Sequence, residues 1–296
     1  MNWNRLFVTT AFVLAISLTG FRSAAQVQQP DSIVVYKTVG DIELELHLFF
    51  PQHHSPEGKT PAILFFHGGG WKGGNPTHFY PQSRYLARRG MVAANAEYRI
   101  KNKHNTTPRE AVEDAKSAIR WLRSHAADFG IDPDKLAAGG GSAGGHIAAA
   151  AGMIDDFANP QIDADSESVS TAGTPASFRP DALVLFNPVF DNGPGGYGYE
   201  RVKPYWRSIS PLHNIDEHAP PTILFFGTED DLVPVSTIKR FKRRMEEHGV
   251  RCDLHLYEGY GHAFFNEAKY TETLYEADRF LESLGYLEGP PTLSVE

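Results

Sequence analysis

Residues 135–153 read KLAAGGGSAGGHIAAAAGM, and this stretch decides the fold. A short candidate strand, 135–138, leads into a glycine-rich turn that carries Ser142, and an alanine-rich run of helical character follows. Gly140 and Gly144 flank the serine in a Gly-x-Ser-x-Gly pattern, and their missing side chains leave room for its hydroxyl to project from the turn. The pattern predicts a strand, a sharp turn that exposes a serine nucleophile, and a helix; taken alone it also fits a tight loop.

Outward from this stretch, continuous apolar runs have the length of strands that are buried on both faces, as in a parallel sheet. These runs are Ala62–Phe66, Met91–Ala94, Ala182–Phe186 and Thr222–Phe226. Apolar and polar residues alternate over 42–48, which predicts an antiparallel strand with one face in water. On that pattern we expect His47 to be a surface residue.

Three segments with helical periodicity separate the predicted strands. Thr107, Pro108 and Glu110 predict an N-cap, a first-turn proline and a capping box. The apolar faces of the three segments are Val112, Ala115, Ile119 and Leu122; Ile238, Phe241 and Met245, before Gly249; and Leu274, Ala277, Leu281 and Leu284, before Gly285. Strands that alternate with such helices predict an α/β fold, a doubly wound and mostly parallel sheet with helices on both faces.

The first 25 residues are typical of a secretory signal peptide. A short basic start precedes an uncharged apolar run, 6–21, and small residues precede Gln26. The run is shorter than the ~20 residues that span a bilayer as a helix. We therefore expect a mature chain, 26–296, that is secreted or periplasmic, has no stable membrane association, and folds as a single domain with a possible cap insertion near 191–218. Residues 285–296 are expected to form a frayed tail.

Composition excludes several classes of partner and site. The 28 Lys and Arg residues against 36 Asp and Glu give a formal charge of −8, so nucleic acid is not an expected ligand. Cys252 is the only cysteine, which rules out an internal disulfide, and its alternating surroundings predict a structural position in a strand. The histidines and acids show no spaced ligand set, so we expect no metal and no cofactor.

Three motifs that follow predicted strands complete a candidate site. His67-Gly68-Gly69-Gly70-Trp71 comes directly after strand 62–66, and its glycines let backbone N–H groups approach a developing oxyanion. Asp230 follows strand 222–226, and His262 lies just past a candidate strand at 252–257. Catalytic groups of open α/β sheets gather at these carboxyl ends. The order Ser142, Asp230, His262 is also the order of the α/β-hydrolase arrangement.

With these motifs the sequence resembles the α/β-hydrolase fold esterases, in particular the relatives of hormone-sensitive lipase and of acetylxylan and feruloyl esterases. The resemblance covers about residues 33–285 and is carried by HGGGW (67–71), EYR (97–99), EDAK (113–116), AIRWLR (118–123), GGSAGGH (140–146), GTEDDLVP (227–234) and GYGHAFF (259–265). One departure matters: the hormone-sensitive-lipase group usually has Asp before the serine, where Gly141 stands. This departure moves the match toward the polysaccharide esterases.

The resemblance implies a catalytic triad and an oxyanion hole. Ser142 would be the nucleophile, His262 the general base and then acid, and Asp230 the group that orients the imidazole. The oxyanion donors would be the backbone N–H groups of Gly69, Gly70 and Ala143. Glu229 and Asp231 compete for the acid role, but the family's Asp-x-x-Val-Pro motif favours the aspartate three residues before Val233, which is Asp230.

The function expected on these grounds is a serine carboxylester hydrolase for short, acetyl-like acyl groups on a small ester or an acylated carbohydrate. Aromatic residues near the predicted cap are candidates for pocket walls, although core packing is the simpler reading for each: Trp71, Tyr197, Tyr199, Tyr205 and Trp206. His67 is expected to brace its loop, and His146 to pack or to lie on the helix surface. The alternatives are an aryl formamidase or peptidase-type amide hydrolase of the same fold, or an inactive binding protein, which would need a missing triad member.

Overall fold

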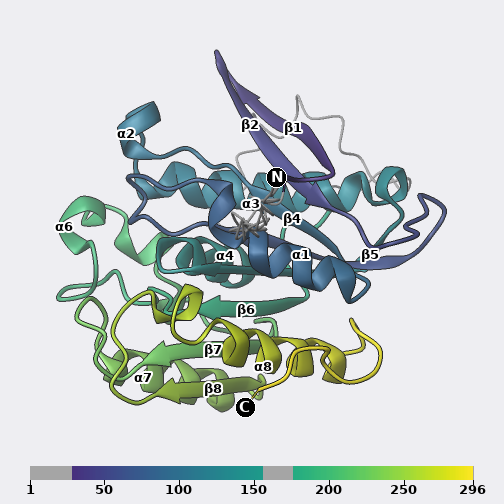
Figure 1. Cartoon of the computed structure of the whole chain (residues 1–296). Helices are drawn as coiled ribbons and strands as arrows, with labels where there is room; N and C mark the ends of the chain where they lie inside the picture. Colours follow the sequence, from purple (N-terminus) through teal and green to yellow (C-terminus); the bar gives the residue numbers. More distant parts are fainter. Residues whose placement is uncertain (1–28, 156–175, 296) are drawn as a thin grey trace, which may run out of the picture.

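The computed structural model describes residues 29–155 and 176–295, and an eight-stranded sheet in the order β1-β2-β4-β3-β5-β6-β7-β8 lies at its centre (Figure 1). The strands are β1 (Ser32–Val39), β2 (Ile42–Phe49), β3 (Thr60–Phe66), β4 (Val92–Ala96), β5 (Ile131–Gly141), β6 (Ala182–Phe186), β7 (Thr222–Gly227) and β8 (Cys252–Tyr257). β2 runs antiparallel to β1 and to β4, and the other neighbouring strands are parallel. The predicted fold class is therefore confirmed.

Helices cover both faces of the sheet (Figure 1). One face packs against α1 (Tyr80–Arg88) and α8 (Tyr270–Ser283), and the other packs against α3 (Pro108–Ser124), α4 (Ala143–Met153) and α7 (Val235–Glu247). The short helices α2 (Lys101–His104) and α6 (Tyr199–Val202) lie outside these layers. In Figure 1 the arrowheads of β6, β7 and β8 point to the side of the molecule where α6 lies.

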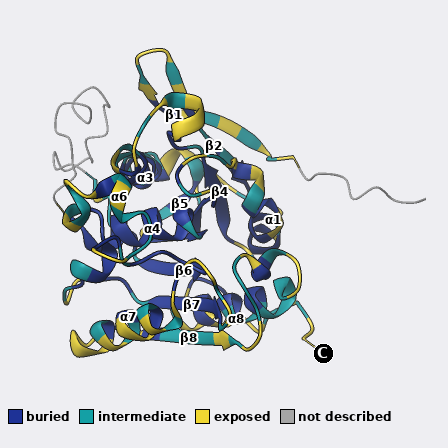
Figure 2. Ribbon diagram, turned by 90° about the vertical axis from the view of Figure 1, so that its left-hand side faces the viewer, coloured by how far each residue is buried: buried dark blue, intermediate teal, exposed yellow. Residues whose placement is uncertain are grey.

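The sheet divides the apolar core in two, because successive side chains of a strand point to opposite faces. In β3, Ala62, Leu64 and Phe66 belong to the core on the α3 and α4 side. Ile63 and Phe65 belong to the core on the α1 and α8 side. All five are buried, as the continuous apolar run of a central parallel strand requires. Figure 2 shows the central strands as buried while α7 keeps an exposed outer face.

The predicted helices form where their capping and periodicity indicate. α3 begins after Thr107, and both hydrogen bonds of the capping box with Glu110 are present. The four residues of its predicted apolar face are fully buried. In α7 the buried residues are the three predicted ones, Ile238, Phe241 and Met245.

The expectation for His47 is wrong. Its side chain is only 13% exposed, and its ring contacts the hydroxyl of Tyr80 and the carboxylate of Glu45. β2 lies inside the sheet between β1 and β4, and Tyr80, at the start of α1, covers that face of the strand. The alternation of apolar and polar residues in β2 does not show that another element packs on its polar face.

The expectation of a frayed tail is also wrong. Tyr286 and Leu287 are buried in the core beside α8. The guanidinium of Arg89 donates hydrogen bonds to the carbonyls of Glu288 and Gly289 at 3.2 and 2.7 Å. The chain after α8 is therefore held by apolar packing and by hydrogen bonds from the side chain of Arg89, which follows α1, to its backbone carbonyls.

The remaining sequence predictions concern the N-terminal segment, membrane association and Cys252. The predicted signal peptide, 1–25, lies outside the described residues. Over 29–155 and 176–295 the structure contains no helix with the length and apolar character that a membrane span requires. Cys252 begins β8, where it is 3% exposed, and burial raises the pKa of its thiol to about 12.

Candidate active site

Ser142 occupies the turn between β5 and α4 with a strained backbone, at φ 54° and ψ −116°. A Cβ on Gly140 would lie 2.6 Å from the carbonyl carbon of Gly144, and a Cβ on Gly144 would lie 2.0 Å from the carbonyl oxygen of Phe66. Neither position accepts a side chain, because the start of α4 packs directly on the ends of β3 and β5. The turn therefore presents the serine at the carboxyl end of the sheet.

His262 links Ser142 to Asp230 across three loops. Its Nε2 lies 2.8 Å from the Oγ of Ser142, and its Nδ1 lies 2.7 Å from the Oδ2 of Asp230. The Oδ1 of Asp230 accepts hydrogen bonds from the N–H groups of Leu232 and Val233. A carboxylate accepts, so Nδ1–H donates to Asp230 and the lone pair of Nε2 faces the serine hydroxyl.

The structure separates Asp230 from the neighbouring acids. The side chain of Asp230 is fully buried, whereas Glu229 and Asp231 are exposed. Among the described residues, His262 forms an ion pair with Asp230 alone. Asp230, the acid that the Asp-x-x-Val-Pro motif favours, is thus the one in contact with His262.

The glycine-rich loop after β3 lies beside the serine. A Cβ on Gly68 would lie 3.6 Å from the Cβ of Ser142. The N–H of Gly68 already donates to the Nδ1 of His78. Gly69 and Gly70 follow with positive φ values of 119° and 62°. No hydrogen bond within the described part of the chain uses their N–H groups or that of Ala143, which opens α4. These three N–H groups remain the candidate oxyanion donors.

A second segment holds this loop in place. The hydroxyl of Tyr98 donates to the carbonyl of His67 at 2.8 Å, and the N–H of Lys101 donates to the carbonyl of Trp71 at 3.0 Å. Between these two contacts, Arg99 donates from its backbone N–H and its guanidinium to the fully buried carboxylate of Asp114. The ammonium of Lys37 completes the cluster with a 2.8 Å contact to the same carboxylate.

Two buried histidines support the site without contacting His262. His67 stacks on Tyr98 with ring centroids 4.2 Å apart, and its Nδ1–H donates to the carbonyl of Gly68. His146, on α4, contacts the carbonyl of Ile209 and the Oδ1 of Asn192 through Nε2, at 2.7 and 2.9 Å. Burial lowers the pKa of both rings to about 4. Both rings are neutral and buried; His67 braces its loop and His146 packs between α4 and the segment 191–218.

The segment 191–218 between β6 and β7 reaches the glycine-rich loop. Arg201 of α6 donates to the carbonyl of Gly70 at 2.9 Å, and its guanidinium lies over the rings of Trp71 and Tyr197. Of the five aromatic candidates, Trp71 and Tyr197 thus lie together, whereas Trp206 contacts His213 instead. The candidate cap therefore touches the site through α6.

Gly141, the residue that departs from the hormone-sensitive-lipase pattern, has no room for a side chain. A Cβ at this position would lie 2.8 Å from the ring of Phe265 and 3.3 Å from the ring of Phe79. These two rings stack on each other with centroids 5.6 Å apart. Aromatic packing fills the space that an aspartate would need.

The sequence prediction missed Asn187, which contacts the histidine. Its Nδ2 lies 3.1 Å from the Nε2 of His262 and 3.4 Å from the Nδ1. Asn187 immediately follows β6, so its place at the carboxyl end of a predicted strand was a usable signal. The contact itself joins residues 75 positions apart and is not visible in the sequence.

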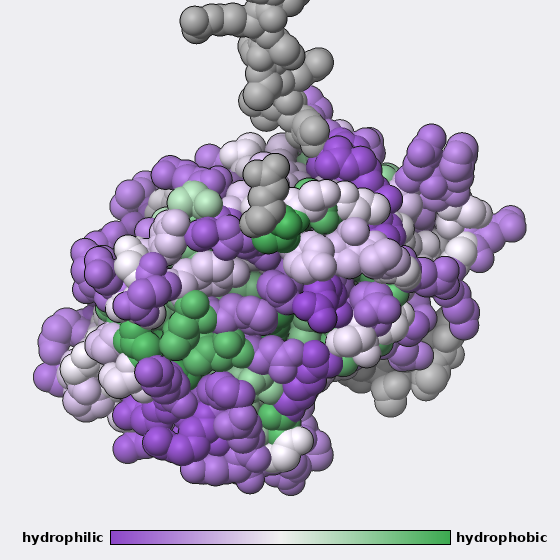
Figure 3. All heavy atoms as spheres, turned by 60° about the horizontal axis from the view of Figure 1, so that its bottom comes forward, coloured by the Kyte–Doolittle hydropathy of each residue, from purple (hydrophilic) through white to green (hydrophobic). Residues whose placement is uncertain are grey.

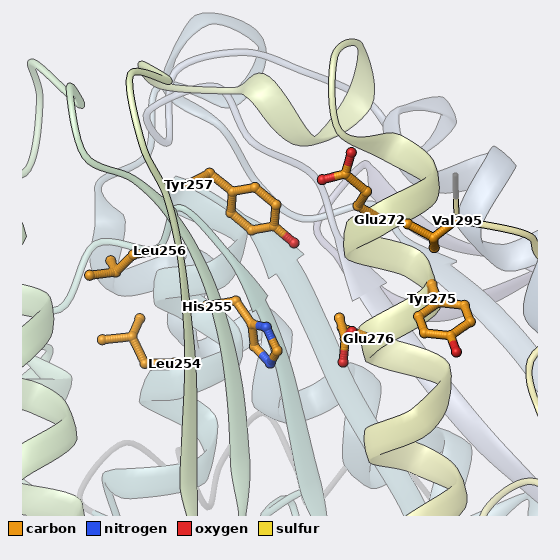
Figure 4. Close-up of a pocket in the computed structure, with 8 residues that line it drawn as sticks. All are labelled: Leu254, His255, Leu256, Tyr257, Glu272, Tyr275, Glu276 and Val295. Atoms are coloured by element: carbon orange, nitrogen blue, oxygen red, sulfur yellow. The ribbon is translucent and has the colours of Figure 1, made fainter.

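A groove with a volume of about 620 Å³ lies elsewhere, between β8 and α8. Figure 4 shows His255 and Tyr257 pointing toward Glu272 and Glu276 of α8, while the leucines of β8 point away. None of the residues that line this groove belongs to the serine site.

Figure 3, which brings the bottom of Figure 1 forward, shows a mostly hydrophilic surface with small hydrophobic patches. Within 29–155 and 176–295 no three His, Cys, Asp or Glu side chains are placed to bind a metal ion.

Two family patterns match the chain in succession. The pattern of the BD-FAE family matches residues 46–192, and that of the dienelactone hydrolase family matches residues 191–284. Esterase LipQ of Mycobacterium tuberculosis is 25% identical over 79% of this chain. The probable isoprenylcysteine alpha-carbonyl methylesterase ICMEL1 of Arabidopsis thaliana is 28% identical over 73% of it. The matches span 57% and 48% of those proteins, so the chain corresponds to about half the length of these curated relatives.

Solved structures match over most of both chains. Thermogutta terrifontis esterase 2 phosphorylated by paraoxon is 41% identical, with 87% of this chain and 95% of that chain covered and a TM-score of 0.79. The butyrate-bound form of the same esterase is 39% identical, covers 89% and 98% of the two chains, and has a TM-score of 0.80.

Proposed function

The chain belongs to the α/β-hydrolase fold esterases, a family of carboxylic ester hydrolases, and from that premise we propose that it hydrolyses short acyl esters through a Ser142–His262–Asp230 triad. The observation that carries the proposal is the continuous contact from the Oγ of Ser142 through His262 to Asp230, at 2.8 and 2.7 Å. A hydroxyl nucleophile needs a base, and the base needs a third group that orients it.

The proposed reaction has two halves. The Oγ of Ser142 attacks the ester carbonyl carbon while the Nε2 of His262 takes its proton, and the carbonyl oxygen becomes an oxyanion that the N–H groups of Gly69, Gly70 and Ala143 stabilise. The imidazolium, held by Asp230, gives the proton to the leaving alkoxide, and an acyl-enzyme remains. Water then attacks the acyl carbon, His262 again takes and returns a proton, and the carboxylic acid and free serine are released.

The proposed substrate is an acetyl-like ester, with an acylated carbohydrate as the preferred alcohol partner. The aromatic packing of Phe79 and Phe265 beside Gly141 supports a short acyl group, since it fills space next to the nucleophile. The solved relative, Thermogutta terrifontis esterase 2, binds butyrate and propionate, both short carboxylates. Tyr197 of the candidate cap is partly exposed and packs on the buried ring of Trp71, so it offers an aromatic ring to a pyranose.

Paraoxon provides a direct test of the nucleophile, since the solved relative is phosphorylated by it. We expect one diethylphosphoryl group on the peptide that contains Ser142, located by mass spectrometry, and a loss of p-nitrophenyl acetate hydrolysis in proportion to labelling. Ser142→Ala should neither react nor hydrolyse the ester while keeping the wild-type circular dichroism. Labelling of another residue, or near-normal turnover by Ser142→Ala, would reject the proposed triad.

A series of p-nitrophenyl esters tests the substrate. We expect kcat/KM to fall steeply beyond about four acyl carbons, because added CH₂ groups would not gain the ~0.8 kcal/mol of burial that a fitting groove provides. Acetylated xylan should release acetate. Rising values toward twelve carbons would identify a lipase-like enzyme, and faster cleavage of aryl formamides than of esters would favour the amide-hydrolase alternative.

We also propose that the protein is exported by its first 25 residues and acts in the periplasm or outside the cell, without nucleic-acid partners or stable membrane attachment. The basic, apolar and small-residue order of that segment supports export. N-terminal sequencing of protein from the periplasm or the medium should begin at Gln26. A start at Met1 would contradict the proposal.

A further inference from the structure

Asn187 is held against the imidazole of His262 in an uncommon backbone conformation. Its φ is 35°, in the left-handed region that side-chain-bearing residues rarely adopt. The residue is fully buried, and its N–H donates to the carbonyl of Phe225 at 2.7 Å, which ties the end of β6 to β7. Strained residues of this kind cluster at functional sites, where the surrounding structure holds them in place.

The amide of Asn187 does not compete with the two hydrogen bonds of the ring. The Nε2 of His262 faces Ser142 and its Nδ1 faces Asp230, so both in-plane directions are in use. The amide nitrogen lies 3.1 and 3.4 Å from these two ring nitrogens. In the plane of the ring, a point this close to both nitrogens would overlap Cε1, so the amide lies over the face of the ring.

Asn187 also has an unused acceptor. Its Oδ1 is buried and has no hydrogen-bond partner among the described residues. A half-turn about the last side-chain torsion exchanges Oδ1 and Nδ2 and brings the oxygen over the ring of His262. The amide oxygen carries a partial negative charge, so at this position it stabilises the positive charge of the protonated ring.

From this geometry, and resting on the proposed triad, we propose that Asn187 is a positioning residue for the ester hydrolysis: its amide fixes the ring of His262 and stabilises the imidazolium that forms when Ser142 gives up its proton. The groups that face the ring then come from three loops: Ser142 after β5, Asn187 after β6 and Asp230 after β7. This role raises kcat and leaves the binding of the ester unchanged.

Asn187→Gly tests the role because glycine accepts the positive φ and removes the amide. We expect kcat for p-nitrophenyl acetate to fall roughly 10-fold, the loss of about one neutral hydrogen bond in the transition state, with KM within about twofold of wild type. Asn105→Gly is the matched control, since Asn105 also has a positive φ, of 53°, but is exposed at the end of α2. It should keep the wild-type kcat.

Asn187→Asp separates an electrostatic role from a structural one. A carboxylate over the ring favours the imidazolium, so the acid limb of the kcat/KM profile should move to higher pH, by about one unit. At pH values above the shifted limb, kcat should recover relative to Asn187→Gly. Wild-type kcat in Asn187→Gly, or an unmoved acid limb in Asn187→Asp, would overturn this role. Those outcomes would leave the triad intact, whereas active Ser142→Ala would reject the triad itself.

Discussion

Ser142 adopts a backbone conformation that costs stability and presents the hydroxyl. At φ 54° and ψ −116° a Cβ is unfavourable, and glycine is the residue that adopts this region freely. We therefore predict that the free energy of unfolding of Ser142→Gly is about 1 kcal/mol higher than that of Ser142→Ala. Both variants should lack esterase activity. Urea denaturation of the two variants measures the difference. Equal stabilities would mean that the turn stores no strain at this residue.

At the residue scale, the members of the candidate triad were predictable because each follows a recognisable strand in the expected order. Asn187 follows a predicted strand too, but asparagine there has no motif that marks it. Its role depends on contact with His262, which follows β8, and this contact arises only when β6, β7 and β8 lie side by side. The reason for Gly141 was equally hidden, since Phe79 and Phe265 come from distant segments.

Among the elements, α3 carries the buried carboxylate on which the glycine-rich loop depends. Asp114 accepts from Arg99 and Lys37 and has no exposed surface. We predict that Asp114→Asn lowers the free energy of unfolding by about 3–5 kcal/mol, because two cations lose their buried partner. Thermal or urea unfolding checks this value.

The control for Asp114 is Asp155→Asn. Asp155 pairs with Arg179 at 2.8 Å but is 71% exposed, so its loss should cost well under ~1 kcal/mol. Similar losses in the two variants would show that burial of the Asp114 cluster contributes little. A surviving Asp114→Asn protein should also show reduced kcat, since Arg99 lies between the two contacts that hold the loop.

His146 of α4 contacts Ile209 and Asn192 of the candidate cap, and its burial makes the stability depend on pH. His146 has a folded pKa of about 4 against an ordinary 6.5, so the unfolded chain binds a proton that the folded chain excludes. The contribution of His146 to the free energy of unfolding is therefore fully present above pH 6.5. It is lost as the pH drops toward 4, by up to about 1.4 kcal/mol per pH unit. His67 adds a second contribution of the same sign.

Urea unfolding at several pH values measures this contribution of His146. His146→Gln should reduce the slope between pH 6.5 and 4, because it removes one of the protons that burial excludes from the folded chain. His218→Gln should keep the wild-type slope, since that side chain is 73% exposed. An unchanged slope in His146→Gln would contradict a buried neutral ring.

Helices and strands marked by patterns of residues close in sequence could be predicted, but which elements pack against them could not. The capping box and apolar face of α3 and the apolar runs of the parallel strands rest on residues close in sequence. The order β2-β4-β3 depends on which strands pair, and the burial of His47 depends on α1 packing over β2. β5 is longer than its predicted segment because Thr60 of β3 pairs with Ile131.

For the whole molecule, the chain after α8 closes the core. Leu287 is buried beside α8 and its neighbour Glu288 is exposed. We predict that Leu287→Ala lowers the free energy of unfolding by at least about 2 kcal/mol, as core truncations do, while Glu288→Ala changes it by less than ~0.5 kcal/mol. Equal effects in chemical denaturation would restore the frayed-tail expectation.

The single buried thiol makes the protein a convenient host for site-directed spectroscopy. Maleimides react with thiolate, and Cys252, with a pKa of about 12 and 3% exposure, presents almost none at pH 7. A cysteine introduced at an exposed position such as Glu247, at the end of α7, would take up a fluorophore alone, without prior removal of the native residue. With a second cysteine introduced on α6, a pair of dyes would report the distance between α7 and the candidate cap.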